Sequence, residues 1–122
     1  MTRSELIDYC LTYPDAYEDY PFDSGPDAAD SAAVIRHRLN KRIFALIMVR
    51  DGLSINLKCE PLRADFLRGM YKGVTPGYHM NKLHWNTVLV DSDVPIEELY
   101  AMIDHSYKLT MPKAVKKLPE SL

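Results

Sequence analysis

The sequence contains little cysteine. Of its 122 residues only Cys10 and Cys59 are cysteines, and they lie far apart along the chain. They do not form the closely spaced pair that a zinc site uses, and two thiols are too few for a disulfide-rich secreted scaffold. We therefore expect two reduced, buried thiols and no metal or other cofactor.

Long apolar runs are also missing. The longest, residues 43–49 (IFALIMV), has the length of a strand and is far shorter than the roughly 18 apolar residues that a membrane span needs. The N-terminal MTRSELIDYC lacks the basic start and apolar core of a secretory signal. We expect a cytoplasmic location, no membrane partner, and one domain over residues 1–122.

Neither sign of charge dominates the whole chain, which has 15 Lys and Arg against 17 Asp and Glu and a formal net charge of −2. The two signs are unevenly distributed, however. Residues 1–30 hold one basic and eight acidic side chains, whereas residues 31–90 hold ten basic and three acidic ones. This asymmetry permits a basic face on a protein with a slightly acidic pI. A surface on which both signs are interspersed is an equally acceptable interpretation.

Helix-start and turn residues organise the N-terminal third. Thr2 with Glu5 forms a capping-box pattern, which predicts a helix that begins at Arg3 and ends before Pro14. Residues 15–31 are rich in Asp, Pro, Gly and Ala, and they predict a loop.

Three strands are predicted next, over residues 33–39, 42–49 and 53–58. Asp51-Gly52 is a strong hairpin signal between the second and the third of these strands. The third strand alternates leucine and isoleucine with polar residues, which predicts a solvent-exposed face carrying Ser54 and Asn56.

The second half of the chain adds two helices and more strand. Pro61 suits the first turn of a helix, and the four-residue spacing of apolar side chains predicts a buried face. That face would carry Leu62, Phe66 and Met70. Residues 84–90 predict a strand, and a third helix follows from Ile96.

The predicted order is α-β-β-β-α-β-β-α. Such an order predicts an α+β domain with two layers, in which helices pack mainly on one face of an antiparallel sheet of about five strands.

The most unusual segment is residues 75–88, TPGYHMNKLHWNTV, which holds both asparagine and histidine pairs and the single tryptophan. Thr-Pro-Gly is typical of a turn, in which Pro76 restricts the backbone and Gly77 permits a positive φ. Trp85 would share a strand face with Thr87 and Leu89, and we interpret it as a core residue.

This segment resembles a characteristic block of the MmcQ/YjbR family of small bacterial proteins. The runs LSINLKCEP, YKGVTPGYHMNKLHWNTV and VPIEELYAMIDHSYKL, with YEDYPF upstream, are all similar to that family, so the resemblance covers residues 13–109. It implies a compact α+β domain related to secretion-chaperone-like and frataxin-like sheets, and a DNA-binding function. The stretch DSGPDAADSAAVIRHRL is longer and richer in Asp and Ala than the family pattern, which leaves the start of the first strand open.

DNA binding needs cations for phosphates and side chains that reach or stack on bases. The segment and its neighbouring elements supply both kinds. The candidate nucleic-acid-binding residues are Arg36, Arg38, Lys58, Tyr78, His79, Asn81, Lys82, His84 and Asn86. His79 and His84 can equally serve to fix the bend by hydrogen bonds to the backbone.

Catalysis is disfavoured by the same sequence. His79 and His84 do not have a recognised zinc spacing. Asp104, His105 and Ser106 are consecutive on a predicted helix, where side chains point about 100° apart and cannot relay a proton. The alternative to DNA binding is a module that binds a protein or peptide through the sheet face or an edge strand.

Overall fold

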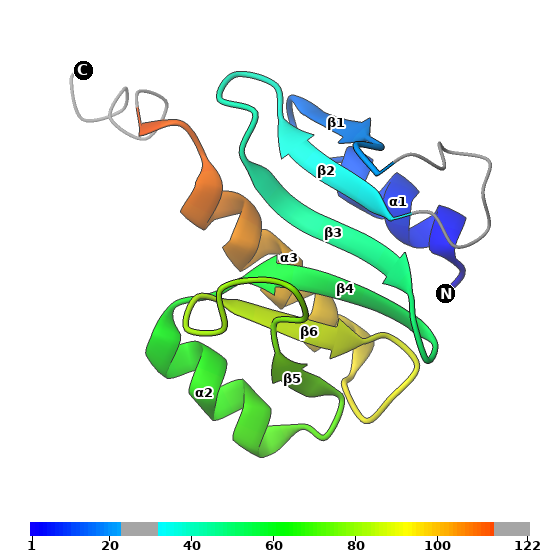
Figure 1. Cartoon of the computed structure of the whole chain (residues 1–122), viewed down its shortest axis with the longest axis vertical. Helices are drawn as coiled ribbons and strands as arrows, with labels where there is room; N and C mark the ends of the chain where they lie inside the picture. Colours follow the sequence, from blue (N-terminus) through cyan, green and yellow to red (C-terminus); the bar gives the residue numbers. More distant parts are fainter. Residues whose placement is uncertain (23–31, 114–122) are drawn as a thin grey trace.

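The computed structural model describes residues 1–22 and 32–113. In this part of the chain an open antiparallel sheet of six strands, in the order β1-β2-β3-β4-β6-β5, is accompanied by three helices (Figure 1), which confirms the predicted α+β class. The elements are α1 (Arg3–Leu11), β1 (Ala16–Asp19), β2 (Ala33–His37), β3 (Ile43–Val49), β4 (Leu53–Lys58), α2 (Pro61–Met70), β5 (Val74–Pro76), β6 (Trp85–Leu89) and α3 (Ile96–Thr110).

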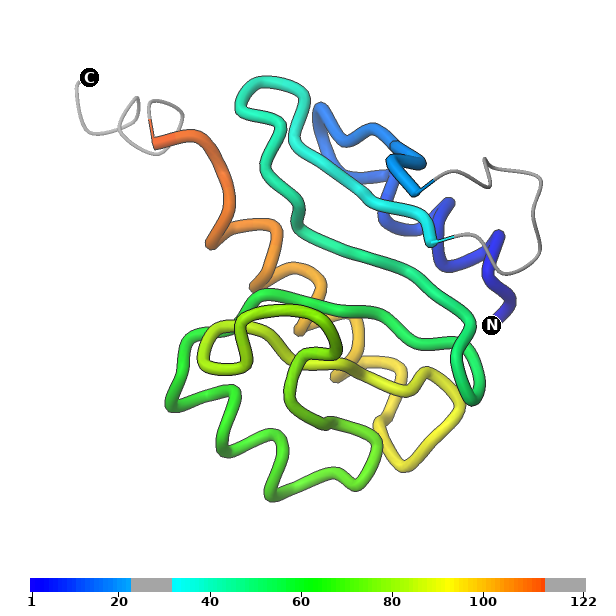
Figure 2. Tube along the Cα trace, viewed as in Figure 1, coloured from blue at the N-terminus to red at the C-terminus, as the bar shows by residue number. Residues whose placement is uncertain are grey.

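The path of the chain explains the strand order. Strands β2, β3 and β4 form a meander, and the chain then passes through α2 to the far edge of the sheet before β6 returns between β5 and β4 (Figure 2). Asp51 and Gly52 have φ values of 55° and 113°, so the predicted β3–β4 hairpin turn is confirmed.

The helices cover one face of the sheet, which we call the inner face. Helix α1 packs against β1 to β3, α3 packs against β3 and β4, and α2 packs against β5 and β6. The predicted capping box of α1 is present, because Thr2 Oγ1 accepts a hydrogen bond from the Glu5 amide and Glu5 accepts one from the Thr2 amide. The core between helices and sheet includes Phe44, Ile47, Ile55, Leu57, Val88, Leu99 and Ile103.

The predicted loop over residues 15–31 is wrong in its first part. Ala16–Asp19 forms the edge strand β1, which pairs antiparallel with β2 from Ala16 opposite His37 to Asp19 opposite Val34. The sequence AYED carries no apolar alternation, so its strand state comes from pairing with β2 and not from local preference. Residues 23–31 of the predicted loop lie outside the described residues.

The solvent-exposed face predicted for β4 is also wrong. Ser54 and Asn56 are only 4% and 1% exposed. They point to the outer face of the sheet, opposite the helices, where the segment between β5 and β6 crosses (Figure 1). Asn56 donates to the Tyr78 carbonyl of this segment, and Ser54 lines a pocket together with Tyr78. The polar residues that alternate along β4 therefore lie in a second buried layer, on the outer face of the sheet.

Helix α2 turns a different side inward from the one predicted. Leu62, Phe66 and Met70 are 89%, 61% and 53% exposed, whereas Ala64 and Leu67 are buried. The helix lies at the edge of the sheet and packs mainly against β5 and β6, so a narrow inward face is enough to complete the core. The larger apolar stripe is left on the surface.

Candidate functional site

The segment between β5 and β6 is attached to the outer face of the sheet by a chain of hydrogen bonds. Asn56 donates from Nδ2 to the Tyr78 carbonyl at 3.0 Å and accepts from Thr87 Oγ1 at 2.5 Å. Thr87 Oγ1 in turn accepts from the Tyr78 amide at 2.8 Å. Because Asn56 and Thr87 face each other on β4 and β6, the sheet register itself fixes where the segment crosses.

Arg68 on α2 holds the other end of this segment. Its Nε donates to Asn86 Oδ1 at 2.6 Å, and its Nη2 donates to the Trp85 carbonyl at 3.2 Å and to the Lys82 carbonyl. Asn86 donates to the Ala64 carbonyl at 3.3 Å and is 2% exposed. Both the oxygen and the nitrogen of the Asn86 side-chain amide thus have hydrogen-bond partners inside the protein. The structure therefore does not place Asn86 where it could read a base.

Gly77 and Trp85 make the closest backbone approach of the turn. The Gly77 amide donates to the Trp85 carbonyl at 2.8 Å, and a Cβ on residue 77 would lie 2.8 Å from the Trp85 Cβ. Glycine is required here by this approach and not by a positive φ, which the turn places at His79 instead. Pro76 ends β5 and pairs with Asn86.

Trp85 is not a core residue of the kind predicted. It is half-buried, and along β6 the residues fully buried toward the helices are Asn86 and Val88. The predicted core face of Trp85, Thr87 and Leu89 is therefore wrong, because all three lie on the outer face of the sheet.

The middle of the segment is exposed but locally ordered. Asn81 Oδ1 accepts from the Leu83 amide at 2.9 Å, and the Asn81 carbonyl accepts from the His84 amide at 3.2 Å. The His84 carbonyl accepts from the Cys59 amide at 2.8 Å, which ties the segment to the end of β4. His79 and Lys82 are exposed.

Two cationic residues, Arg50 and Lys72, lie beside this segment, and we call them its charged margin. The Arg50 guanidinium lies 3.7 Å from the centroid of the Tyr78 ring, and the rings of Tyr78 and His79 are 4.0 Å apart. Lys72 is fixed at its backbone by Asp93, whose carboxylate accepts from the Lys72 and Gly73 amides at 2.7 and 2.8 Å. These two hydrogen bonds lower the pKa of the Asp93 carboxyl.

Arg50 and Lys72 also line a small pocket on the outer face. It encloses about 170 Å³, and its lining includes hydroxyl groups as well as the two cations and one carboxylate. The lining residues are Met48, Arg50, Asp51, Ser54, Lys72, Gly73, Thr75, Tyr78, Thr87 and Leu89. Sequence reasoning did not single out Arg50, because its position relative to Tyr78 depends on how the later segment folds back over β4.

Three further candidates lie outside this margin. Arg36 forms an ion pair with Asp19 at 2.9 Å and donates to the Lys41 carbonyl, so its charge is compensated. Arg38 lies over the Tyr17 ring at 5.2 Å, near the opposite edge of the sheet. Lys58 is half-buried at the end of β4, opposite Trp85. The structure therefore does not bring Arg36 and Arg38 to the segment.

The sequence Asp104-His105-Ser106 does not form a proton relay. Ser106 Oγ donates to the Phe44 carbonyl at 2.5 Å and accepts from the Lys58 amide at 2.9 Å. His105 Nε2 accepts from the Glu60 amide at 3.4 Å, and burial together with the Arg63 charge lowers the pKa of its imidazole. Ser106 acts as a link between α3 and the strands.

Within residues 1–22 and 32–113 no group of three or more His, Cys, Asp or Glu side chains is arranged to hold a metal ion. None of the helices in this part of the chain has the length and apolar character needed to cross a membrane.

Known proteins share both the sequence and the fold. Residues 11–109 match the sequence model of the YjbR family. The chain is 32% identical to a protein named YjbR from Escherichia coli strain K12, with 98% of this chain and 92% of the other covered. It is also 32% identical to a protein named YyaQ from Bacillus subtilis, with 90% and 98% covered.

Solved structures agree with these relatives. A crystal structure from Pseudomonas syringae superposes with a TM-score of 0.79 at 34% identity, covering 91% of this chain and all of the other. A Deinococcus radiodurans protein gives a TM-score of 0.78 at 34% identity, covering 93% and 80%. The segments that carry the resemblance seen in the sequence, residues 75–88 among them, all fall in the matched region or overlap it, and the chain belongs to the YjbR family.

Proposed function

We propose that the protein binds nucleic acid through the outer face of its sheet, at the surface formed by Arg50, Lys72, Tyr78, His79 and Lys82. The observation that carries the proposal is the position of Arg50 and Lys72 around a hydroxyl-lined pocket beside the exposed part of residues 77–84. Cations with neighbouring hydroxyl donors are the groups that contact phosphates, and they position a nucleic acid without reading its sequence.

The aromatic pair of this surface suits an unpaired base. Tyr78 and His79 adjoin each other, and Arg50 lies against Tyr78, so a base could stack beside a cation that contacts its phosphate. The described acidic residues of the N-terminal segment lie on or next to α1 and β1, and β1 is the sheet edge opposite β5. The repulsion that these N-terminal carboxylates exert on a polyanion is therefore weaker at the proposed surface than near β1.

Lys82→Ala and Arg50→Ala should each weaken binding to DNA of any sequence. Losing one phosphate contact should lower the slope of log affinity against log salt by about 1 for duplex DNA. The measurement is a fluorescence-anisotropy titration of labelled duplex and single-stranded DNA, at about 50 and 200 mM salt. If Tyr78 and His79 stack on bases, the single strand should bind more tightly than the duplex.

Arg42→Ala is the matched control, because Arg42 is an exposed cation before β3 and away from the proposed surface. It should leave the salt slope unchanged. The proposal fails if neither DNA form binds at tens of micromolar protein, or if Arg42→Ala changes the slope as much as Lys82→Ala does.

A second candidate function, contact with another protein, is favoured by the exposed apolar stripe of α2. Leu62 and Met70 lie four residues to either side of Phe66, and Gly69 beside them has no neighbouring atom within 4 Å of a Cβ position. An antiparallel copy of α2 would place Phe66 against Phe66 and Leu62 against Met70. Most homo-oligomers are symmetric, and two-fold dimers are the commonest of them. We therefore propose that a second copy of this chain covers the exposed stripe of α2.

Phe66→Glu should then abolish dimer formation, since a buried carboxylate without a partner is strongly unfavourable. Sedimentation equilibrium up to about 0.5 mM protein measures this directly. Leu39→Glu replaces another exposed apolar residue, far from α2, and should leave the dimer intact. A wild-type protein that stays monomeric over this range rejects the second candidate and leaves the nucleic-acid proposal untouched.

A further inference from the structure

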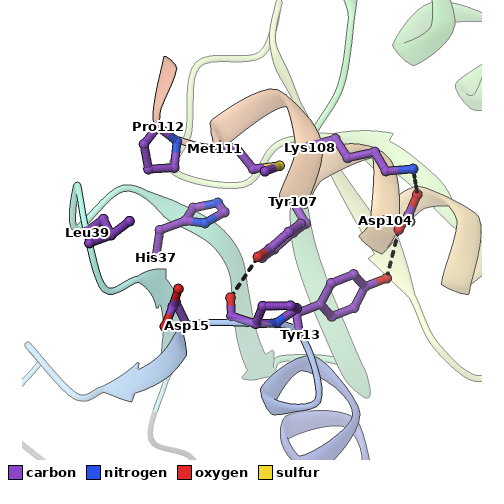
Figure 3. Close-up of a pocket in the computed structure, with 10 residues that line it drawn as sticks. Tyr13, Asp15, His37, Leu39, Asp104, Tyr107, Lys108, Met111 and Pro112 are labelled. Atoms are coloured by element: carbon purple, nitrogen blue, oxygen red, sulfur yellow. Dashed lines mark hydrogen bonds and ion pairs between the residues drawn. The ribbon is translucent and has the colours of Figure 1, made fainter. Parts of the chain in front are cut away.

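A second cavity lies away from the proposed nucleic-acid surface, between the end of α1, the turn after β2 and the end of α3. It encloses about 530 Å³ and shares no residue with the outer-face pocket. Its lining residues, shown in Figure 3, are Tyr13, Pro14, Asp15, His37, Leu39, Asp104, Tyr107, Lys108, Met111 and Pro112. Cavities of about 300–1,000 Å³ are the size that small-molecule sites use.

Three aromatic rings form the wall of this cleft. The Tyr107 ring centroid lies 4.7 Å from that of Tyr13 and 4.6 Å from that of His37. The Tyr107 hydroxyl donates to the Pro14 carbonyl at 2.7 Å, and His37 Nε2 lies 2.7 Å from Thr110 Oγ1. The polar ends of both rings are therefore held by the protein, which fixes the rings and leaves an apolar aromatic wall.

The two carboxylates at the rim of the cleft differ in their partners. Asp104 forms an ion pair with Lys108 at 2.8 Å and accepts a hydrogen bond from the Tyr13 hydroxyl, as Figure 3 shows on one side of Tyr107. Asp15 lies on the other side, and none of the residues in the described ranges donates to its carboxylate or forms an ion pair with it. The described lining of the cleft thus carries two carboxylates, Asp15 and Asp104, against one ammonium, that of Lys108.

The backbone of Asp15 is fixed at the rim of the cleft, where this residue is exposed. Asp15 has a φ of 57°, and its carbonyl accepts from the Arg38 amide at 2.8 Å. Asp and Asn are the non-glycine residues that best tolerate this left-handed conformation. Burial raises the pKa of the Tyr107 phenol, and the nearby Asp15 charge raises that pKa further, so the phenol stays neutral beside the carboxylate.

We propose that this cleft binds a small organic cation, an amine or guanidinium carried on an apolar or aromatic body. The body would pack against Tyr13, Tyr107 and Met111, and the cationic group would lie between the Asp15 carboxylate and the aromatic rings. Aromatic faces attract a cation through the ring quadrupole, and a carboxylate adds a direct charge interaction. An anionic ligand would meet the Asp15 carboxylate and a lysine that already pairs with Asp104.

Three probes of matched shape test the proposal: tyramine as the cation, 4-ethylphenol as the neutral form, and 3-(4-hydroxyphenyl)propionate as the anion. Two-dimensional NMR of the labelled protein measures both affinity and location. Tyramine should shift the signals of His37, Tyr107 and Met111 and bind about tenfold more tightly than 4-ethylphenol, with the anion weakest.

Asp15→Asn should remove this preference for the cation while leaving 4-ethylphenol binding unchanged. The variant should fold normally, since Asn keeps the left-handed backbone. Asp65→Asn, an equal change of charge on the exposed side of α2, is the control and should leave all three affinities as in the wild type.

Several results would overturn the proposal: no shift at the cleft with any probe, equal binding of the cation and the neutral form, tightest binding of the anion, or an Asp15→Asn protein that still prefers tyramine. Because the cleft and the nucleic-acid surface share no residue, the DNA titrations give an independent result.

Discussion

Phe44→Ala should lower the free energy of unfolding by about 3–5 kcal/mol, the usual cost of truncating a large core aromatic. Phe44 is fully buried, and its ring centroid lies 5.1 Å from those of His37 and Tyr107 and 5.9 Å from that of Tyr13. The substitution therefore removes both buried apolar area and the ring against which the wall of the cleft packs. Urea unfolding followed by circular dichroism gives the change.

Phe22→Ala provides the matched comparison, because Phe22 is 54% exposed. Its substitution should alter the free energy of unfolding by no more than about 0.5 kcal/mol. A Phe44→Ala protein as stable as Phe22→Ala would mean that the ring cluster is not part of the cooperative core.

The sequence predicted correctly the features that depend on residues close together along the chain. The capping box of Thr2 and Glu5 and the Asp51-Gly52 turn depend on residues within three positions of each other, and both are present in the structure. Strand β1 had no such signal, since its hydrogen bonds come from β2. Its existence could not be inferred from AYED alone.

Periodicity identified α2 but not its buried side. The helix carries two apolar faces, one with Leu62 and Phe66 and a narrower one with Ala64 and Leu67. Helical spacing gives the larger face the stronger signal, yet the position of α2 at the sheet edge buries the narrower one. Only the three-dimensional arrangement decides which face is buried. The apolar stripe that stays exposed is the feature on which the proposed dimer contact rests.

The sequence pointed to a segment, and the structure shows how available its individual residues are. His79, Asn81 and Lys82 are exposed, whereas Gly77 is buried. The roles of polar residues differed, because Asn56 and Asn86 find hydrogen-bond partners that are 18 to 31 positions away. Arg36 was compensated by Asp19 in the same way, through the unpredicted strand β1.

Arg68→Ala should destabilise the protein by about 2–3 kcal/mol and should do so mainly by releasing residues 77–84. The change removes the charged donor for Asn86 and for two carbonyls, and it leaves the buried Asn86 oxygen without that partner. Hydrogen exchange measured by mass spectrometry should show amides of this segment exchanging about 30- to 150-fold faster, as that free energy predicts for local opening.

Two variants separate the effect of the three Arg68 hydrogen bonds from the effect of its positive charge. Arg68→Lys keeps the charge, but a single ammonium cannot reach three acceptors in a planar fork, so exchange should still accelerate. Arg63→Ala removes an exposed arginine from the same helix and should leave the segment protected. If Arg68→Ala leaves exchange in residues 77–84 unchanged, Arg68 is not needed to hold the segment, and its other hydrogen bonds, those to Asn56 and Thr87 among them, are sufficient. A faster-exchanging segment with weaker DNA binding would instead show that the proposed surface depends on an ordered backbone as well as on its cations.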